Sequence, residues 1–262
     1  MLIAAVFGLV VGALLGLLGA GGSILTIPAL VYGVGIPLHS AIPTSLLVVA
    51  LSAAAGLIAR WRSNVIRWPV ALVFAVASVP AAFAGTALGQ LVPDRWLLVT
   101  FAGLMVTVAV RMLTSTTETG GACRTSSGTV NWRSCLPKAL AAGAVVGVLT
   151  GAFGVGGGFI IVPALTMLLG LTATEAVATS LVVVTVTALA GLGAHVRAMP
   201  DLNYTITIAF AGAAMTAAAV AGRFGHRIPA PTIRRVFAYL ILIVALAVAA
   251  AALFAPGTLH AR

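Results

Sequence analysis

The chain has 262 residues, of which 61% are hydrophobic and 7% charged, with a formal net charge of +10 and a mean hydropathy of +1.20. Soluble domains carry about 25% charged residues, so this composition excludes a soluble globular protein. The basic excess does not indicate a nucleic-acid partner. The basic residues lie in short loops between apolar runs, as the positive-inside rule of membrane proteins requires.

Long apolar runs predict membrane helices along the chain, since crossing the ~30 Å hydrocarbon core takes about 20 helical residues. No Lys or Arg precedes the first run and no small-residue cleavage site follows it, so we interpret it as a retained helix, not a signal peptide. The fold class is therefore predicted to be an all-α polytopic membrane protein. The runs are 2–18, 41–59, 69–89, 97–110, 139–153, 176–194, 203–221 and 236–255, with shorter ones at 24–38 and 159–171.

Each of the two shorter runs follows a cluster of glycines and contains a proline. The first segment reads GLLGAGGSILTIPAL (16–30) and the second GAFGVGGGFIIVPAL (151–165). A glycine inside a helix costs about 1 kcal/mol relative to alanine and a proline about 3 kcal/mol. We therefore expect a helix break at each cluster, with Pro28 and Pro163 as hinge residues.

An offset of 135 positions aligns these two segments with each other. The same offset also aligns the helix that follows each of them. AIPTSLLVVALSAAAGLIARWR (41–62) lies on AVATSLVVVTVTALAGLGAHVR (176–197) without a gap. With one inserted residue the match extends further and places Gly89 on Gly225. A shared period of this kind indicates a duplicated architecture. The predicted organisation is a first membrane repeat at 1–113, a polar linker at 114–136 and a second membrane repeat at 137–262.

Loop charges indicate that the two repeats have opposite orientations. The loop after the Thr-Ser helix is basic in the first half, whereas Arg197 and Asp201 cancel in its counterpart. In the next loop, Asp94 and Arg95 cancel in the first half and the counterpart is basic. Because basic loops stay cytoplasmic, this alternation predicts inverted repeats. The basic residues are Arg60, Arg62 and Arg67 in one loop and Arg223, Arg227, Arg234 and Arg235 in the other.

This orientation determines how often the chain crosses the bilayer. The basic loops and the linker are predicted to be cytoplasmic and both termini periplasmic, in a multi-pass membrane protein. Each glycine-broken segment must then return to the side it came from, as a re-entrant hairpin or as a pair of short spanning helices. Each repeat accordingly comprises one such segment and three transmembrane helices.

The broken helices predict a binding site for an anion. Amides at a helix start lack an intrahelical acceptor, the helix dipole makes that end positive, and glycines let a ligand approach the backbone. Two such sites related by a pseudo-two-fold axis can face one substrate near the midplane. The alternative is that the glycines only permit close helix packing. The candidate substrate-binding residues are Gly19, Gly21, Gly22 and Ser23, and Gly154, Gly156, Gly157 and Gly158.

Two hydroxyl pairs are further candidates for substrate binding. Thr44 and Ser45 stand near the start of a long helix, and Thr179 and Ser180 align with them. Their hydroxyls can donate to an oxyanion without placing a charge in lipid. The alternative is local bonding of these hydroxyls to the preceding helical turn.

Three titratable residues are candidates for coupling or gating. Glu175 is the only acid inside the apolar blocks, and such acids often carry protons. However, Thr172 and Glu175 also have the spacing of a capping box. His39, near a membrane edge, can titrate near neutral pH or serve only at the interface. Arg60 can mark topology or attract anions to the pore mouth.

The scarcity of acids argues against coupling to protons or sodium. Export of an anion from a cell that is negative inside needs no coupled ion, since the membrane potential supplies about 2.3 kcal/mol per charge per 100 mV. Outward transport is therefore the expected direction.

The paired motifs GAGGSILTIPAL and GVGGGFIIVPAL, with their downstream ATSL-type helices, resemble the TauE/SafE family of sulfite exporters and related permeases. The resemblance covers nearly the whole chain. It implies transport of a small sulfur oxyanion or organosulfonate, such as sulfite, sulfoacetate or thiosulfate. The first half departs from the second at Ser23, where the second half has Gly158.

The leading hypothesis is a secondary transporter for such an anion, with the bilayer and the anion as partners and neither cofactor nor metal. One alternative is an anion channel of the same architecture. Another is an intramembrane enzyme, for which Ser23 and His39 are the only tempting nucleophile and base. We do not expect an enzyme, and a purely structural membrane scaffold would not explain the duplicated helix breaks. The oligomeric state, including a homo-oligomer, stays open.

Overall fold

A computed structural model describes residues 2–18, 23–61, 65–114, 132–153, 158–195 and 204–224, and residues 235–246 except 237 and 240. Throughout these ranges the regular structure is helical, and five helices are long and apolar enough to cross a membrane: α3, α4, α6, α8 and α9. The prediction of an all-α polytopic membrane protein is confirmed. The elements are α1 (Leu2–Leu18), α2 (Ser23–Pro28), the π-helical η1 (Ala29–Val34), α3 (Leu38–Arg60), α4 (Trp68–Gly89), α5 (Asp94–Thr114), α6 (Trp132–Phe153), α7 (Gly158–Leu169), α8 (Ala173–Ala194) and α9 (Tyr204–Phe224).

The helix that follows each glycine cluster is short. The α7 helix has 12 residues, and α2 and η1 have 6 residues each. At 1.5 Å per residue, twelve helical residues cover about 18 Å, well short of the ~30 Å hydrocarbon core. These lengths favour segments that enter the membrane only part of the way.

Both short arms end in the same kind of turn. Gly35 after η1 has φ = 79° and Gly170 after α7 has φ = 66°, in the left-handed region that favours glycine. The next amide then bonds back six residues in both cases, from Ile36 to Leu30 at 3.1 Å and from Leu171 to Leu165 at 3.3 Å. These positions correspond under the offset of 135, so the repeats agree in local backbone geometry.

The two central helices, α3 and α8, run antiparallel. A β-carbon on Gly56 would lie 3.6 Å from Leu181, and one on Gly191 would lie 3.2 Å from Leu46. Gly56 aligns with Gly191 and Leu46 with Leu181, so the two contacts are equivalent. Antiparallel helices that make equivalent contacts are related by a two-fold axis perpendicular to them. This geometry supports inverted repeats.

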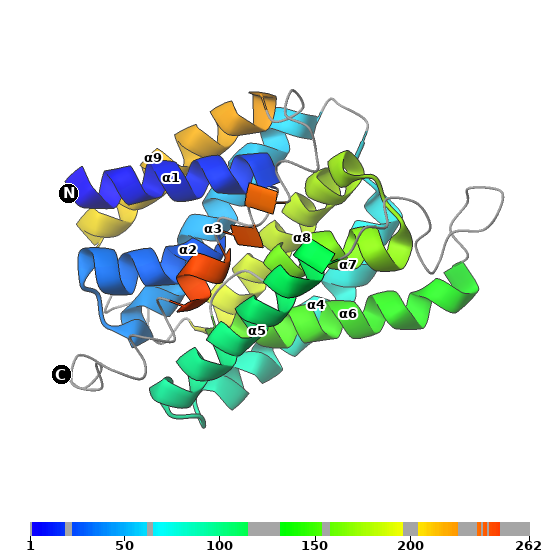
Figure 1. Cartoon of the computed structure of the whole chain (residues 1–262), viewed down its shortest axis with the longest axis horizontal. Helices are drawn as coiled ribbons and strands as arrows, with labels where there is room; N and C mark the ends of the chain where they lie inside the picture. Colours follow the sequence, from blue (N-terminus) through cyan, green and yellow to red (C-terminus); the bar gives the residue numbers. More distant parts are fainter. Residues whose placement is uncertain are drawn as a thin grey trace.

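The order of packing across the molecule is α1, α9, α3, α8, α4 and α6 (Figure 1). The counterparts in the two repeats are α1 and α6, α3 and α8, and α4 and α9. Exchanging each helix for its counterpart reverses the order, so the packing is symmetric about α3 and α8. The first helix of each repeat therefore packs on the other repeat, α1 along α9 and α6 along α4.

Glycines at every fourth position make these two inter-repeat packings close. In both pairs the contacts advance in the same direction along the two helices, so each pair is parallel. Close approach of this kind is typical of membrane helices with small-xxx-small spacing. Gly8, Gly12 and Gly16 face Phe210, Ala214 and Ala218, while Gly143, Gly147 and Gly151 face Phe74, Ser78 and Ala82.

Candidate functional site

On either side of each glycine cluster the described residues form separate helices. α1 ends at Leu18 and α2 begins at Ser23, while α6 ends at Phe153 and α7 begins at Gly158. Ser23 is the first residue of α2, and Gly158 is the first residue of α7. The other glycines that the sequence predicts to bind the substrate lie outside the described residues: Gly19, Gly21 and Gly22, and Gly154, Gly156 and Gly157.

The helix ends beside the two breaks contribute to one hydrophobic cluster. Leu17 and Leu25 come from α1 and α2, and Phe153 and Ile160 come from α6 and α7. α2 also contacts α7 directly. The ring of Phe153 lies 5.4 Å from that of Phe101 on α5, between ring centroids. The N-terminal ends of α2 and α7 are thus gathered into one region of the molecule.

Three of the four predicted hydroxyls bond to their own helix. Thr44 donates to the carbonyl of Ser40 at 2.7 Å, and Ser45 donates to that of Ile42 at 2.8 Å. Ser180 donates to the carbonyl of Val177 at 2.9 Å. All three side chains are buried. To donate to a substrate, these hydroxyls would have to rotate away from the carbonyls they now contact.

The fourth hydroxyl, Thr179, makes a contact between the repeats. Its Oγ1 accepts a hydrogen bond from the backbone N–H of Arg67 at 3.1 Å, and its side chain is buried. The aligned Thr44 makes no equivalent contact with the described residues of the other repeat, and its hydroxyl bonds within α3. Within the described part of the chain, the two hydroxyl pairs therefore differ at this position.

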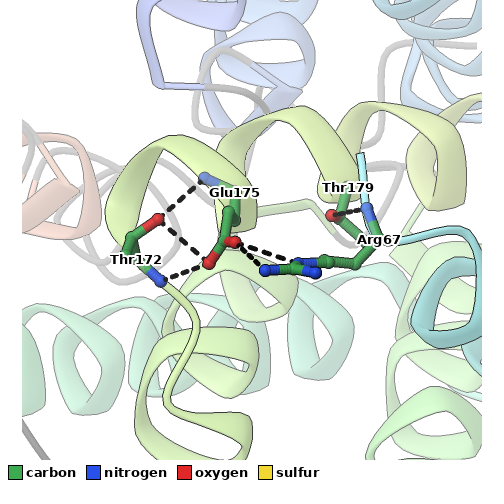
Figure 2. A network of polar contacts seen from close by, with 4 residues as sticks. All are labelled: Arg67, Thr172, Glu175 and Thr179. Carbon is green, nitrogen blue, oxygen red and sulfur yellow. Dashed lines mark hydrogen bonds and ion pairs between the residues drawn. The ribbon is translucent and has the colours of Figure 1, made fainter. Parts of the chain in front are cut away.

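Glu175 lies in the first turn of α8 and completes a capping box (Figure 2). Thr172 Oγ1 accepts from the Glu175 amide at 3.4 Å, and the Thr172 amide donates to Glu175 Oε2 at 3.1 Å. The capping interpretation of the sequence is confirmed. The other carboxylate oxygen, Oε1, accepts from Arg67 Nε at 2.9 Å and Nη2 at 2.5 Å. Coupling or gating by Glu175 stays a prediction.

The remaining predicted residues occupy helix ends and interiors. His39 is in the first turn of α3, and Arg60 is the last residue of that helix. Pro28 ends α2, after which the chain continues as the π-helical η1, a common helix distortion near proline. Pro163 lies inside α7, and the helix continues through it. The two prolines thus do not have the same local effect.

The sequence did not predict Arg67 as the partner of Glu175, because a basic residue in a loop does not indicate which distant residue it contacts. It also missed Ser52 on α3, whose fully buried Oγ has no hydrogen-bond partner among the described residues. Ser52 aligns with Thr187, which donates to the carbonyls of Val183 at 2.9 Å and Val184 at 3.2 Å. The alignment could have singled out this pair of polar positions.

Replacing Ser52 with alanine is expected to stabilise the protein. A buried hydroxyl without a partner costs about 1–3 kcal/mol, and Ser52→Ala removes it. The matched variant Thr187→Val removes a bonded hydroxyl and should lower the free energy of unfolding by about 1 kcal/mol. Thermal unfolding in detergent measures both. Equal destabilisation by the two variants would contradict the assignment of Ser52 as unpaired.

Comparisons with known proteins agree on one family. Residues 4–248 match the family described as sulfite exporter TauE/SafE. The chain is 35% identical over 244 residues to a probable membrane transporter protein of Xylella fastidiosa strain Temecula1, covering 91% of each chain. It is 27% identical to the probable membrane transporter protein YdhB of Bacillus subtilis strain 168, covering 83% of this chain and 87% of the relative. No solved structure matches the chain significantly.

Proposed function

The chain belongs to the sulfite exporter TauE/SafE family of membrane proteins, and from this premise we propose that it transports a small anion across the bilayer. The substrate class is a sulfur oxyanion or an organosulfonate, such as sulfite, thiosulfate or sulfoacetate. The family name and the membrane transporter relatives support transport. The function requires no cofactor and no chemical conversion of the solute.

The observation that carries the proposal is the meeting of the two broken segments. Side chains on both sides of each break belong to one hydrophobic cluster, and α2 contacts α7. Two helix N-termini, at Ser23 and Gly158, therefore lie in one region. Helix N-termini bind anions through free amides and a favourable dipole, without a cationic side chain. The antiparallel α3 and α8 supply the two-fold relation that would let both termini act on one solute.

The proposed direction is outward, from a cytoplasm that is negative relative to the outside. The chain contains only four Asp and Glu residues, which leaves little to couple anion import to a cation gradient. Export is favoured by about 2.3 kcal/mol per charge for each 100 mV of potential. The proposed location is the bacterial inner membrane, with the linker and basic loops cytoplasmic. The contact of Arg67 with the start of α8 supports this topology, because inverted repeats place both on one side.

Proteoliposomes under an imposed potential test the function. We expect uptake of labelled sulfite, thiosulfate or sulfoacetate that saturates with concentration and rises when the potential favours anion entry. Protein-free liposomes and vesicles at zero potential are the controls. Flux that rises without saturation would favour an anion channel of the same fold. No flux with any of the three solutes would contradict the proposed substrate class.

A further inference from the structure

A polar network joins the two repeats at one end of the central helices (Figure 2). Arg67 belongs to the first repeat and precedes α4, whereas Thr172, Glu175 and Thr179 belong to the second repeat at the start of α8. Arg67 and Glu175 form an ion pair at 2.5 Å. We name Arg67, Glu175 and Thr179, which make the contacts between the repeats, the inter-repeat clamp.

Arg67 is attached to α8 by both its side chain and its backbone. The guanidinium donates two hydrogen bonds to Glu175 Oε1, and the backbone N–H donates to Thr179 Oγ1. The rings of Trp61 and Trp68 pack edge to face with centroids 5.3 Å apart, which ties the end of α3 to the start of α4. The end of α3 and the start of α4 are therefore packed together where Arg67 contacts α8.

The clamp cannot be repeated at the opposite end of the molecule. Ser40 aligns with Glu175 and Pro37 with Thr172, so neither the acid nor the capping hydroxyl is present there. At that end Thr44 donates its hydroxyl to the Ser40 carbonyl instead. In transporters with inverted repeats, access alternates when one repeat or bundle moves against the other. An ion pair of these residue types, present at one end and not repeated by the aligned residues at the other, favours the state that is closed at its own end.

We propose that the inter-repeat clamp is a gate latch that holds the transporter closed at the end where α4 and α8 begin. Opening at that end moves the start of α4 locally away from α8 and separates Arg67 from Glu175, while the glycine-packed contact of α4 with α6, which begins at Phe74, stays in place. The inference rests on transport as the function and is independent of which anion is carried. Side-chain exposure is 59% for Arg67 and 16% for Glu175, so water reaches the pair. Partly exposed ion pairs are weak, which lets the latch open during turnover.

Thiol labelling without substrate tests the latch separately from the proposed substrate. The background replaces the two native cysteines, Cys123 and Cys135, with serine. Ala71→Cys is the reporter, because Ala71 is 1% exposed and lies one helical turn beyond Arg67. We expect Arg67→Gln and Glu175→Gln each to speed maleimide labelling about threefold to fivefold, the shift corresponding to a weak ion pair. The double variant should label no faster than either single variant.

Matched variants separate a latch from simple loosening of the helix end. Glu175→Gln keeps a side-chain acceptor at the capping position, since Gln also serves in capping boxes. Thr172→Ala removes the cap but leaves both charges, and Arg67→Lys keeps the positive charge; both should label close to the parent rate. The proposal would be overturned if the two Gln variants labelled at the parent rate or if their effects added in the double variant. It would also be overturned if Thr172→Ala labelled as fast as the Gln variants.

A reversible cross-link gives a second readout. In the same cysteine-free background, Arg67→Cys with Glu175→Cys is joined by a bifunctional methanethiosulfonate reagent. We expect transport to fall at least tenfold and to return on reduction, while either single cysteine with the reagent has little effect. Full transport by the cross-linked protein would contradict a gate at this position. Absence of transport in the uncross-linked parent, with normal labelling changes, would instead count against the proposed substrate.

Discussion

Alanine at Gly12 or Gly147 is expected to cost about 3 kcal/mol of stability, because overpacking forces two helices apart. A β-carbon on Gly12 would lie 2.6 Å from Ala214 Cα, and one on Gly147 would lie 2.8 Å from Ser78 Cα. Backbone cannot move aside as a side chain can. Both variants should therefore unfold at much lower temperature in detergent, as measured by thermal unfolding and by size-exclusion chromatography.

Three other glycines provide the control for this prediction. Beyond the glycine's own stretch of helix backbone, no atom of the described residues lies within 4 Å of a β-carbon placed on Gly103, Gly193 or Gly212. Alanine there should be neutral or stabilising, since alanine favours a helix by about 1 kcal/mol over glycine. Similar unfolding temperatures for both sets of variants would mean that α1–α9 and α4–α6 are not packed this closely.

Leucine at Gly157 is expected to reduce anion flux to the background of protein-free liposomes. Gly157 belongs to the second glycine cluster, immediately before α7 begins at Gly158. In the proposed anion site, a large side chain at this position would block the approach of the anion to the amides at that helix start. The variant should still insert into the membrane. Labelled sulfite uptake and quantification of inserted protein together measure the effect.

Gly193→Leu is the matched control in the same repeat. Gly193 lies on α8 with open space where a β-carbon would be placed, so leucine there should leave flux near the parent level. Normal flux through Gly157→Leu would count heavily against an anion cradle at the breaks. Loss of insertion would be met with the smaller Gly157→Ala, for which a partial loss of flux is expected.

Uninterrupted hydrophobicity predicted the helices well. The run at 69–89 corresponds to α4 (Trp68–Gly89), and the run at 176–194 corresponds to α8 (Ala173–Ala194). Lipid requires every backbone group to be bonded within the segment, so apolar length determines helix position. The start of α6 differs: it begins at Trp132, inside the predicted polar linker. Polar helical turns outside the hydrocarbon core leave no hydropathy signal.

Contacts between helices far apart in the sequence could not be predicted from a single sequence. The spacing of the glycines at 8, 12 and 16 predicts close helix packing, but it does not indicate that α9 is the partner. The capping box at Thr172 was predictable because it is local, within four residues. The ion pair of Glu175 with Arg67 was not, because it joins residues 108 positions apart. Candidate binding residues at the breaks remain predictions from sequence.

The exchange of helices between repeats has a consequence for biosynthesis. Among the described helices, the glycine-lined face of α1 packs on α9, which is synthesised with the second repeat, and α4 likewise packs on α6 of the second repeat. Neither repeat contains both helices of these close pairs. The first repeat must therefore enter the bilayer with the glycine-lined face of α1 and the packing face of α4 exposed to lipid. Assembly is therefore post-insertional. It also follows that an ancestor with a single repeat could have formed these helix pairs only as two copies inserted in opposite orientations.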